Sequence, residues 1–108
     1  MQEVVAWVKV ATASALAVGE MMQVEVEDED IAVYHLEDGF YATSDVCTHA
    51  SQSLSHGTLS GHIVACPKHG GKFDVRTGQA TAFPCVIPLS TFDVEVRGDE
   101  VWLNYEDE

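Results

Sequence analysis

Basic residues are scarce in this 108-residue chain, which has five Lys and Arg against 18 Asp and Glu and a formal net charge of −13. A surface of this sign repels phosphate backbones, so nucleic-acid binding is excluded as a function. No apolar run is long enough to span a membrane. Residues 4–18 are fairly apolar, but Lys9 interrupts them and no positive segment precedes them. We therefore expect neither a secretory signal nor a membrane anchor.

Cysteine is also rare, and no catalytic set stands out. The three cysteines cannot all pair with one another, and nothing in the chain requires an oxidising compartment. The cytoplasm is therefore the expected location. No Ser–His–acid set and no phosphate-binding loop is recognisable. The hydrophobic content of 46% and the length predict one folded domain, residues 1–108, without room for a separate catalytic domain.

Short runs rich in β-branched and aromatic residues predict an all-β fold. Asp38-Gly39 predicts a two-residue hairpin turn, and residues 97–100 include the turn of a closing hairpin. Residues 12–19 are the only segment that we expect to form a helical turn. The predicted strands are residues 4–10, 22–26, 31–36, 40–43, 63–65, 92–96 and 101–103.

Two short pairs of potential metal ligands are the most informative feature of the chain. Cys47-Thr48-His49 and Cys66-Pro67-Lys68-His69 each offer one thiolate and one imidazole, and 16 residues separate them. Two soft anionic ligands and two neutral ligands suit either a mixed-ligand iron–sulfur cluster or a closed zinc site.

The spacing within the pairs favours the cluster. One residue between Cys47 and His49 is cramped for ligands of a single tetrahedral ion, whereas it is reasonable when the two side chains reach different metals. In a mixed-ligand [2Fe–2S] centre two histidines replace two cysteines on one iron, so each loop can give a Cys to one iron and a His to the other. A zinc-stapled binding module without a redox role stays the alternative.

The residues around the second pair carry a family resemblance. After His69 the chain continues with Gly70-Gly71-Lys72-Phe73-Asp74 and Thr77-Gly78, and Pro84 and Pro88 bracket a short apolar stretch. With Cys-Thr-His and Cys-Pro-x-His, this pattern resembles the Rieske ferredoxins that serve bacterial aromatic-ring dioxygenases. The resemblance covers nearly the whole chain.

The resemblance implies a cofactor, a ligand set and a fold. It implies one Rieske [2Fe–2S] cluster, with Cys47 and Cys66 on an inner iron and His49 and His69 on an outer iron near the surface. It also implies that residues 84–88 form a third loop covering the cluster. The expected fold is a Rieske-like antiparallel β-sandwich or small barrel with an insertion formed by the two Cys/His loops. Residues 1–44 and 86–108 would form the basal sheets, and residues 45–85 the cluster-binding subdomain.

The function implied by this resemblance is electron transfer rather than catalysis. A flavin-dependent ferredoxin reductase would reduce the cluster, and a terminal Rieske non-haem iron oxygenase that hydroxylates aromatic compounds would receive the electron. Both irons have all their ligands, which leaves no open position for substrate. We expect a monomer. A small subunit of a larger reductase complex, such as nitrite reductase, is the alternative function.

Differences from respiratory Rieske proteins predict a low potential. Those proteins join their loops by a disulfide, where this chain has Ser51 and Lys68, and they place hydroxyl side chains where it has Gly71 and Phe73. Fewer donors stabilise the reduced cluster less. We therefore expect a potential at the low end of the span of roughly −150 to +300 mV.

The remaining cysteine and the charge distribution leave open questions. Cys85 is expected to be a small buried apolar residue, with a redox role as the alternative. Asp74 is the only acidic residue between Val46 and Phe92. The carboxylates gather elsewhere, notably in residues 25–30. This asymmetry would either orient an encounter with a redox partner or merely keep the protein soluble.

Overall fold

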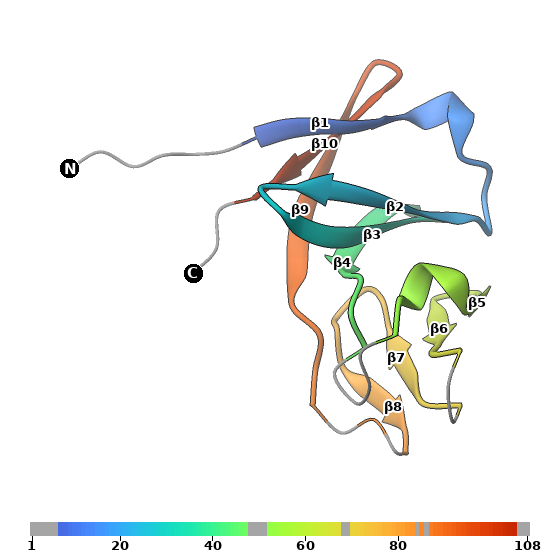
Figure 1. Ribbon diagram of the computed structural model, residues 1–108. Helices are drawn as coiled ribbons and strands as arrows, with labels where there is room; N and C mark the ends of the chain where they lie inside the picture. Colours follow the sequence, from blue (N-terminus) through green and yellow to red (C-terminus); the bar gives the residue numbers. More distant parts are fainter. Residues whose placement is uncertain (1–6, 48–51, 68–69, 84, 86, 106–108) are drawn as a thin grey trace.

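Strands make up almost all of the regular structure in the computed structural model, so the predicted all-β fold is confirmed (Figure 1). The structure describes residues 7–47, 52–67, 70–83, 85 and 87–105. Six strands form a large sheet in the order β1-β10-β9-β4-β3-β2, and four form a small sheet in the order β5-β6-β7-β8. Within the described part of the chain, no helix is long and apolar enough to cross a membrane.

The large sheet contains the longer strands. They are β1 (Trp7–Thr12), β2 (Met21–Val26), β3 (Glu29–Leu36), β4 (Gly39–Ser44), β9 (Thr91–Arg97) and β10 (Glu100–Asn104). The strands of the small sheet have three residues each and are β5 (Thr58–Ser60), β6 (Ile63–Ala65), β7 (Lys72–Asp74) and β8 (Ala80–Ala82). The described residues also form two 3₁₀ turns, η1 (Ala13–Ala15) and η2 (Leu54–His56).

Strand β3 lies between the two hydrophobic cores. Successive side chains of a strand point to opposite faces, yet four consecutive residues of β3, 31–34, are all buried. Ile31 and Val33 pack in the core of the large sheet, whereas Ala32, Tyr34 and Leu36 pack in a second core that includes residues of the small sheet. Because both faces of β3 are covered, this strand positions the small sheet against the large one.

Two tight hairpins flank β3, and one of them corrects the prediction. Leu36 pairs with Gly39, so the loop residues of the β3–β4 hairpin are Glu37 and Asp38 rather than Asp38 and Gly39. Gly39 has a φ of 141°, which glycine adopts without penalty, so it begins the next strand instead of closing the turn. The hairpin itself was predicted correctly.

The β2–β3 hairpin turns without glycine. Val26 pairs with Glu29, and the two loop residues Glu27 and Asp28 have φ angles of 53° and 71°. Positive φ at both positions is typical of a type I′ turn, which favours Asn-Gly or Asp-Gly. Because neither residue is glycine, the positive φ angles of these two exposed acidic residues strain the backbone of the turn.

Most of the other predicted elements match the structure, and the shortest ones were missed. Strands β2, β3, β4, β9 and β10 extend their predictions by one or two residues at an end, and β6 matches at residues 63–65. β1 runs to Thr12, while residues 4–6 of that prediction lie outside the described residues. The helical turn at residues 12–19 is η1, but η2 shows that it is not the only one. Strands β5, β7 and β8 were not predicted because three residues show no usable periodicity.

Candidate metal centre

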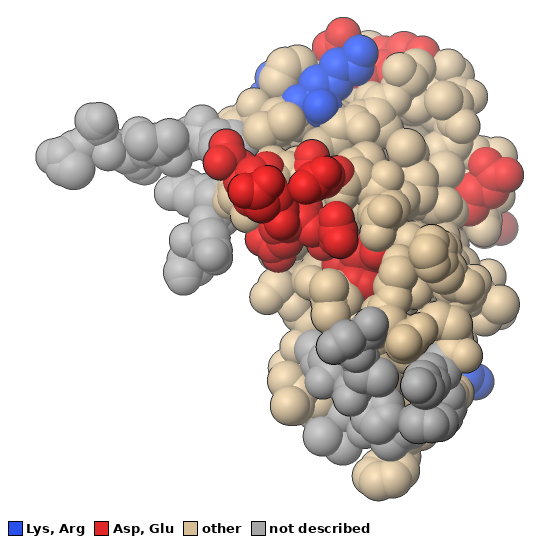
Figure 2. All heavy atoms as spheres, viewed as in Figure 1, with Lys and Arg blue, Asp and Glu red and all other residues tan. Residues whose placement is uncertain are grey.

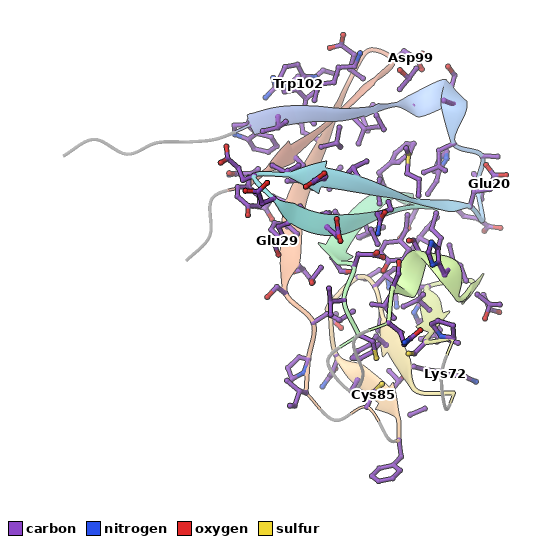
Figure 3. All side chains as sticks on the ribbon, viewed as in Figure 1. Glu20, Glu29, Lys72, Cys85, Asp99 and Trp102 are labelled. Atoms are coloured by element: carbon purple, nitrogen blue, oxygen red, sulfur yellow. The ribbon has the colours of Figure 1, made fainter. Side chains whose placement is uncertain are left out.

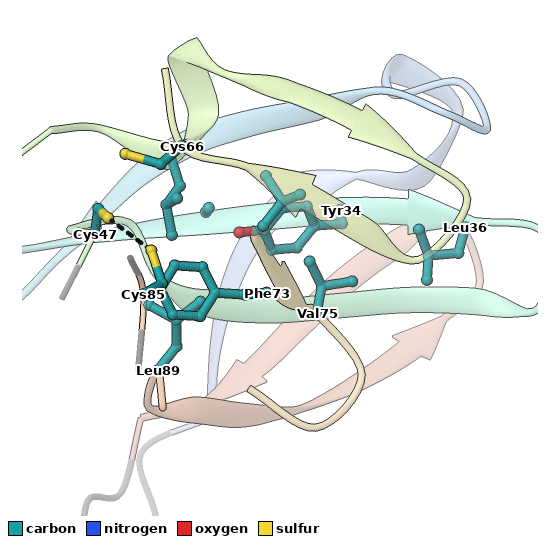
Figure 4. Close-up of a cluster of buried hydrophobic side chains, with 11 residues drawn as sticks. Tyr34, Leu36, Cys47, Cys66, Phe73, Val75, Cys85 and Leu89 are labelled. Carbon is teal, nitrogen blue, oxygen red and sulfur yellow. Dashed lines mark hydrogen bonds between the residues drawn. The ribbon is translucent and has the colours of Figure 1, made fainter. Parts of the chain in front are cut away.

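All three cysteines are buried at the same end of the second core. The exposed fractions of Cys47, Cys66 and Cys85 are 2%, 3% and 3%, and all three side chains pack in the second core, between β3 and the small sheet. Figure 4 shows them at one end of this hydrophobic core, with Leu36 at the other. Cys47 follows β4, Cys66 follows β6 and Cys85 follows β8, so three separate connections bring the thiols together.

The two predicted ligand pairs begin loops of the same length. The Cys47 N–H donates to the carbonyl of Gln52 at 2.9 Å, and the Cys66 N–H donates to the carbonyl of Gly71 at 2.8 Å. Each bond closes its loop five residues after the cysteine. His49 and His69 belong to these loops but lie outside the described residues. The same hydrogen bond between residue i and residue i+5 therefore closes both loops, which could not be seen from the two Cys/His pairs in the sequence.

A buried carboxylate anchors the first loop, and the sequence reasoning missed it. Asp45 accepts hydrogen bonds from Gln23 Nε2 at 2.7 Å, from the Ser55 backbone N–H at 2.8 Å and from the Ser53 hydroxyl. Its own N–H donates to the carbonyl of Asp30 at 3.0 Å. One side chain thus ties the segment before Cys47 to β2 and to η2. Ser53 and Ser55, two polar residues shortly after the first ligand pair, were the sequence feature that could have pointed to a buried acceptor.

A different carboxylate organises the far end of the small sheet. Asp74 Oδ1 accepts from the Arg76 N–H at 2.9 Å and lies 3.4 Å from Arg76 Nε and 3.3 Å from His62 Nδ1. Partial burial alone would raise the pKa of Asp74, but the hydrogen bonds from Arg76 and the contact with His62 outweigh it and lower that pKa. Asp74 therefore stays ionised and holds the turn that follows β7.

Cys85 confirms the prediction of a buried residue and adds a contact. Its Sγ lies 3.8 Å from Cys47 Sγ, and its N–H donates to the carbonyl of Ala82 at 3.1 Å. Burial, together with the neighbouring Cys47 and Cys66, raises the pKa of the Cys85 thiol to about 12. In the predicted third loop, residues 84 and 86 lie outside the described part of the chain.

The described donors fit one half of a mixed-ligand cluster. Cys47 and Cys66 offer two soft sulfur ligands from matched loops, sheltered from water as an inner iron requires. Among the described residues, no group of three or more His, Cys, Asp and Glu side chains is arranged to hold a metal ion. A mixed-ligand cluster would need two further ligands, and the predicted ones, His49 and His69, lie outside the described residues.

Comparison with protein families decides between the cluster and the zinc site. The model of the Rieske [2Fe-2S] domain matches residues 6–93, which is most of the chain. The chain belongs to the Rieske [2Fe-2S] domain family. The cofactor of this Rieske domain is one [2Fe–2S] cluster, and the zinc module is wrong.

Relatives of similar length are ferredoxins. The Rieske domain is 47% identical over 98 residues to ferredoxin CarAc of Metapseudomonas resinovorans, which covers 90% of this chain and 92% of the relative. It is 43% identical over 98 residues to the ferredoxin component of biphenyl 2,3-dioxygenase from Rhodococcus jostii, with 91% and 92% coverage.

Solved structures agree with the fold. The complex of reduced oxygenase and oxidised ferredoxin in carbazole 1,9a-dioxygenase contains a chain that is 46% identical to this one, with a TM-score of 0.89 and coverage of 94% and 95%. The ferredoxin of carbazole 1,9a-dioxygenase from Nocardioides aromaticivorans is 37% identical, with a TM-score of 0.89 and coverage of 93% and 98%. The Rieske-like fold that was expected from the sequence is therefore confirmed.

Proposed function

We propose that this Rieske domain is a one-electron carrier of an aromatic-ring dioxygenase system. The observation that carries the proposal is the match to ferredoxin components along nearly the full length of both chains. The domain is a carrier rather than an enzyme. When bound, the cluster supplies one-electron redox chemistry, and the protein supplies its ligands, its shelter from water and a surface for partners.

The proposed ligand set is Cys47 and Cys66 on one iron and His49 and His69 on the other. Burial of the two cysteines in the second core supports this assignment, because the sulfur-bound iron is then the inner one. Two thiolates cancel the charge of two ferric ions and two sulfides, whereas neutral imidazoles add none. A neutral oxidised centre accepts an electron more easily than a four-cysteine centre of charge minus two.

The proposed docking surface lies on the loop that follows β8. Phe83 is 83% exposed and Ile87 is 58% exposed, and they flank Cys85 in the sequence. An exposed aromatic ring next to a redox centre is a good anchor for a partner, because its burial on docking releases water. The partners that we propose are a flavin-dependent ferredoxin reductase and a terminal Rieske non-haem iron oxygenase. The oxygenase found with the carbazole ferredoxin supports the second.

The charge distribution supports docking at this end. Acidic side chains gather over the β2–β3 hairpin, at Glu25, Glu27, Asp28, Glu29 and Asp30 (Figure 2). Between Val46 and Phe92, Asp74 is the only acidic residue of the sequence. Lys72 and Cys85 lie at the small-sheet end, opposite Asp99 and Trp102 (Figure 3). An acidic body with a less charged tip would orient the molecule in a partner's field.

Further parts of the proposal concern organisation and location. We propose basal sheets from residues 1–44 and 86–108, a cluster-binding subdomain from residues 45–85, a monomer in solution and a cytoplasmic location. The division into two sheets supports the first of these, because β5 to β8 all fall within residues 45–85.

Composition and spectroscopy of the purified protein test the proposal. We expect red-brown protein with equal amounts of iron and acid-labile sulfide, and with nitrogen of ¹⁵N-labelled histidine coupled to the reduced cluster. Protein without iron, or a cluster without nitrogen ligands, would disprove the assignment.

A histidine exchange tests the ligand set residue by residue. His69→Cys adds a negative charge to the cluster, so its potential should fall if the cluster assembles. His56→Cys is the matched control, since His56 is exposed in η2 and is not a proposed ligand. An unchanged potential in an intact His69→Cys cluster would remove His69 from the set.

The alternative function rests on one likeness. The structure of a putative nitrite reductase NADPH small subunit is 26% identical, with a TM-score of 0.76 and coverage of 91% and 97%. A subunit of a reductase complex would copurify with a large partner and would not reduce an oxygenase by itself. The higher identity to the ferredoxin components favours the free carrier.

A further inference from the structure

We propose that Cys85 tunes the cluster by donating its S–H as a hydrogen bond to the sulfur of Cys47. The inference rests on the proposed function, specifically on Cys47 being a cluster ligand. Cys85 would act through that ligand, so it is a positioning and tuning residue rather than a ligand.

The direction of the hydrogen bond follows from the role of Cys47. The two sulfur atoms are 3.8 Å apart, and both side chains are buried (Figure 4). A cysteine that binds iron does so as a thiolate, which has no proton to give. Cys85 is not a proposed ligand, and its burial in an apolar core favours the neutral thiol, which has an S–H to donate. It can therefore only be the donor.

Gly71 makes room for this sulfur. A Cβ built on Gly71 would lie 2.1 Å from Cys85 Sγ and 3.2 Å from Cys85 Cβ. Gly71 does not have a positive φ, so its backbone alone does not require glycine. Any side chain at residue 71 would overlap the Cys85 thiol in its present position beside Cys47.

The contact between Gly71 and Cys85 also bears on the hydrogen-bond donors around the iron–sulfur cluster. Respiratory Rieske proteins have a hydroxyl side chain where this chain has Gly71. The Cys85 thiol occupies the space beside Gly71, and it is a weaker donor than a hydroxyl. The reduced cluster puts more negative charge on its ligand sulfurs, so a donor there stabilises the reduced form more than the oxidised form. Cys85 should therefore raise the potential, by less than a hydroxyl would.

Substitutions at residue 85 test the tuning. In Cys85→Ala the equilibrium constant for reduction should fall about threefold to tenfold, where tenfold corresponds to about 59 mV for one electron. In Cys85→Ser, which is nearly isosteric, the potential should equal or exceed that of the wild type. If Cys85 had only a structural role, the potentials of both variants would fall by the same amount. An intact Cys85→Ala cluster with the wild-type potential would overturn the inference.

A measurement on the wild type keeps the test independent of folding. With Cys47 and Cys66 bound to iron, Cys85 carries the one S–H group of the chain, so the protein should show a single S–H stretching band. Reduction should shift this band to lower frequency, because the hydrogen bond strengthens. A band that does not move on reduction would also overturn the inference.

A Gly71 variant provides a thermodynamic cycle. Gly71→Ala should lower the potential as Cys85→Ala does, because the new Cβ pushes the thiol away from Cys47. In the Cys85→Ala background the same change should have no further effect. Separate additive decreases would contradict the shared cause.

The outcomes separate the inference from the proposed function. Protein that contains no iron and sulfide would disprove the electron carrier, whatever the thiol does. A normal Rieske cluster whose potential ignores both Cys85 substitutions would disprove only the hydrogen bond.

Discussion

The large and small sheets are built on different principles. Strands of the large sheet run for five to eight residues, and β3 aligns six residue pairs with β2 and six with β4. Strands of the small sheet have three residues each, and β6 pairs with β7 through only three. The large sheet holds a core of its own, whereas the small sheet shares its core with β3 and the three cysteines. The small sheet therefore depends on side chains and loops that the large sheet does not need.

Removing the iron–sulfur cluster should destabilise the small sheet much more than the large sheet. Without the cluster, the two Cys/His loops lose the link that joins them, and we expect the amides of β6 and β7 to lose roughly 3 kcal/mol or more of protection. Amides of β3, β9 and β10 should keep theirs. Hydrogen exchange on the native protein and on protein stripped of iron measures both. Equal losses in the two sheets would show that they unfold as one unit.

Removing the Asp45 carboxylate should have the next largest effect. Asp45→Ala leaves several donors around the first loop without an acceptor, so the free energy of unfolding should fall by about 3 kcal/mol. Urea unfolding of the holoprotein measures it, and the cluster should be lost earlier in the same titration. Asp93→Ala, an exposed acid on β9, is the control and should change stability by less than about 0.5 kcal/mol. A wild-type midpoint in Asp45→Ala would contradict the anchoring role.

Truncating Phe83 should affect partner docking without affecting either sheet. Phe83→Ala removes the most exposed large apolar side chain among the described residues, and electron transfer to the oxygenase should lose about tenfold in kcat/KM. Its potential and thermal stability should stay at wild-type values. Val96→Ala, which trims an exposed residue of the large sheet, is the control. If both variants transfer electrons equally well, the docking surface lies elsewhere.

Relieving the strained turn should have the smallest effect and should stay within the large sheet. Replacing Glu27-Asp28 by Asn-Gly suits the positive φ angles and should stabilise the protein by about 1 kcal/mol. The cluster potential should not change, because the turn belongs to the large sheet. Thermal unfolding and voltammetry on one preparation check both statements. A destabilised variant would mean that the two acids make contacts that offset their strain.

The strands of the large sheet were predictable because their side chains repeat. Phe92, Val94 and Val96 alternate with acidic residues, and β9 begins one residue before this run and ends one after it. The small sheet offered no such repeat. Only β6 was found there, since it precedes Cys66 as an apolar run, and β5, β7 and β8 are ordered by pairing with their neighbours.

The candidate site was predictable in its chemistry but not in its surroundings. The two Cys/His pairs are local, so their spacing favoured a two-metal cluster over a single zinc ion. Asp45 is also close in sequence to Cys47, yet one of its partners, Gln23, is 22 residues away. Cys47 and Cys85 are 38 residues apart, and only the packing of the third connection against the first puts their sulfurs in contact.

The amino-acid sequence alone was enough to predict the longer strands, the charge of the protein and two Cys/His pairs that suit a metal centre, because each depends on residues a few positions apart. Folding was needed to bring three buried thiols to one end of a core, to bind Asp45 from several elements and to place Cys85 against Gly71. Those contacts join distant segments, and their geometry follows from how β3 packs between two cores.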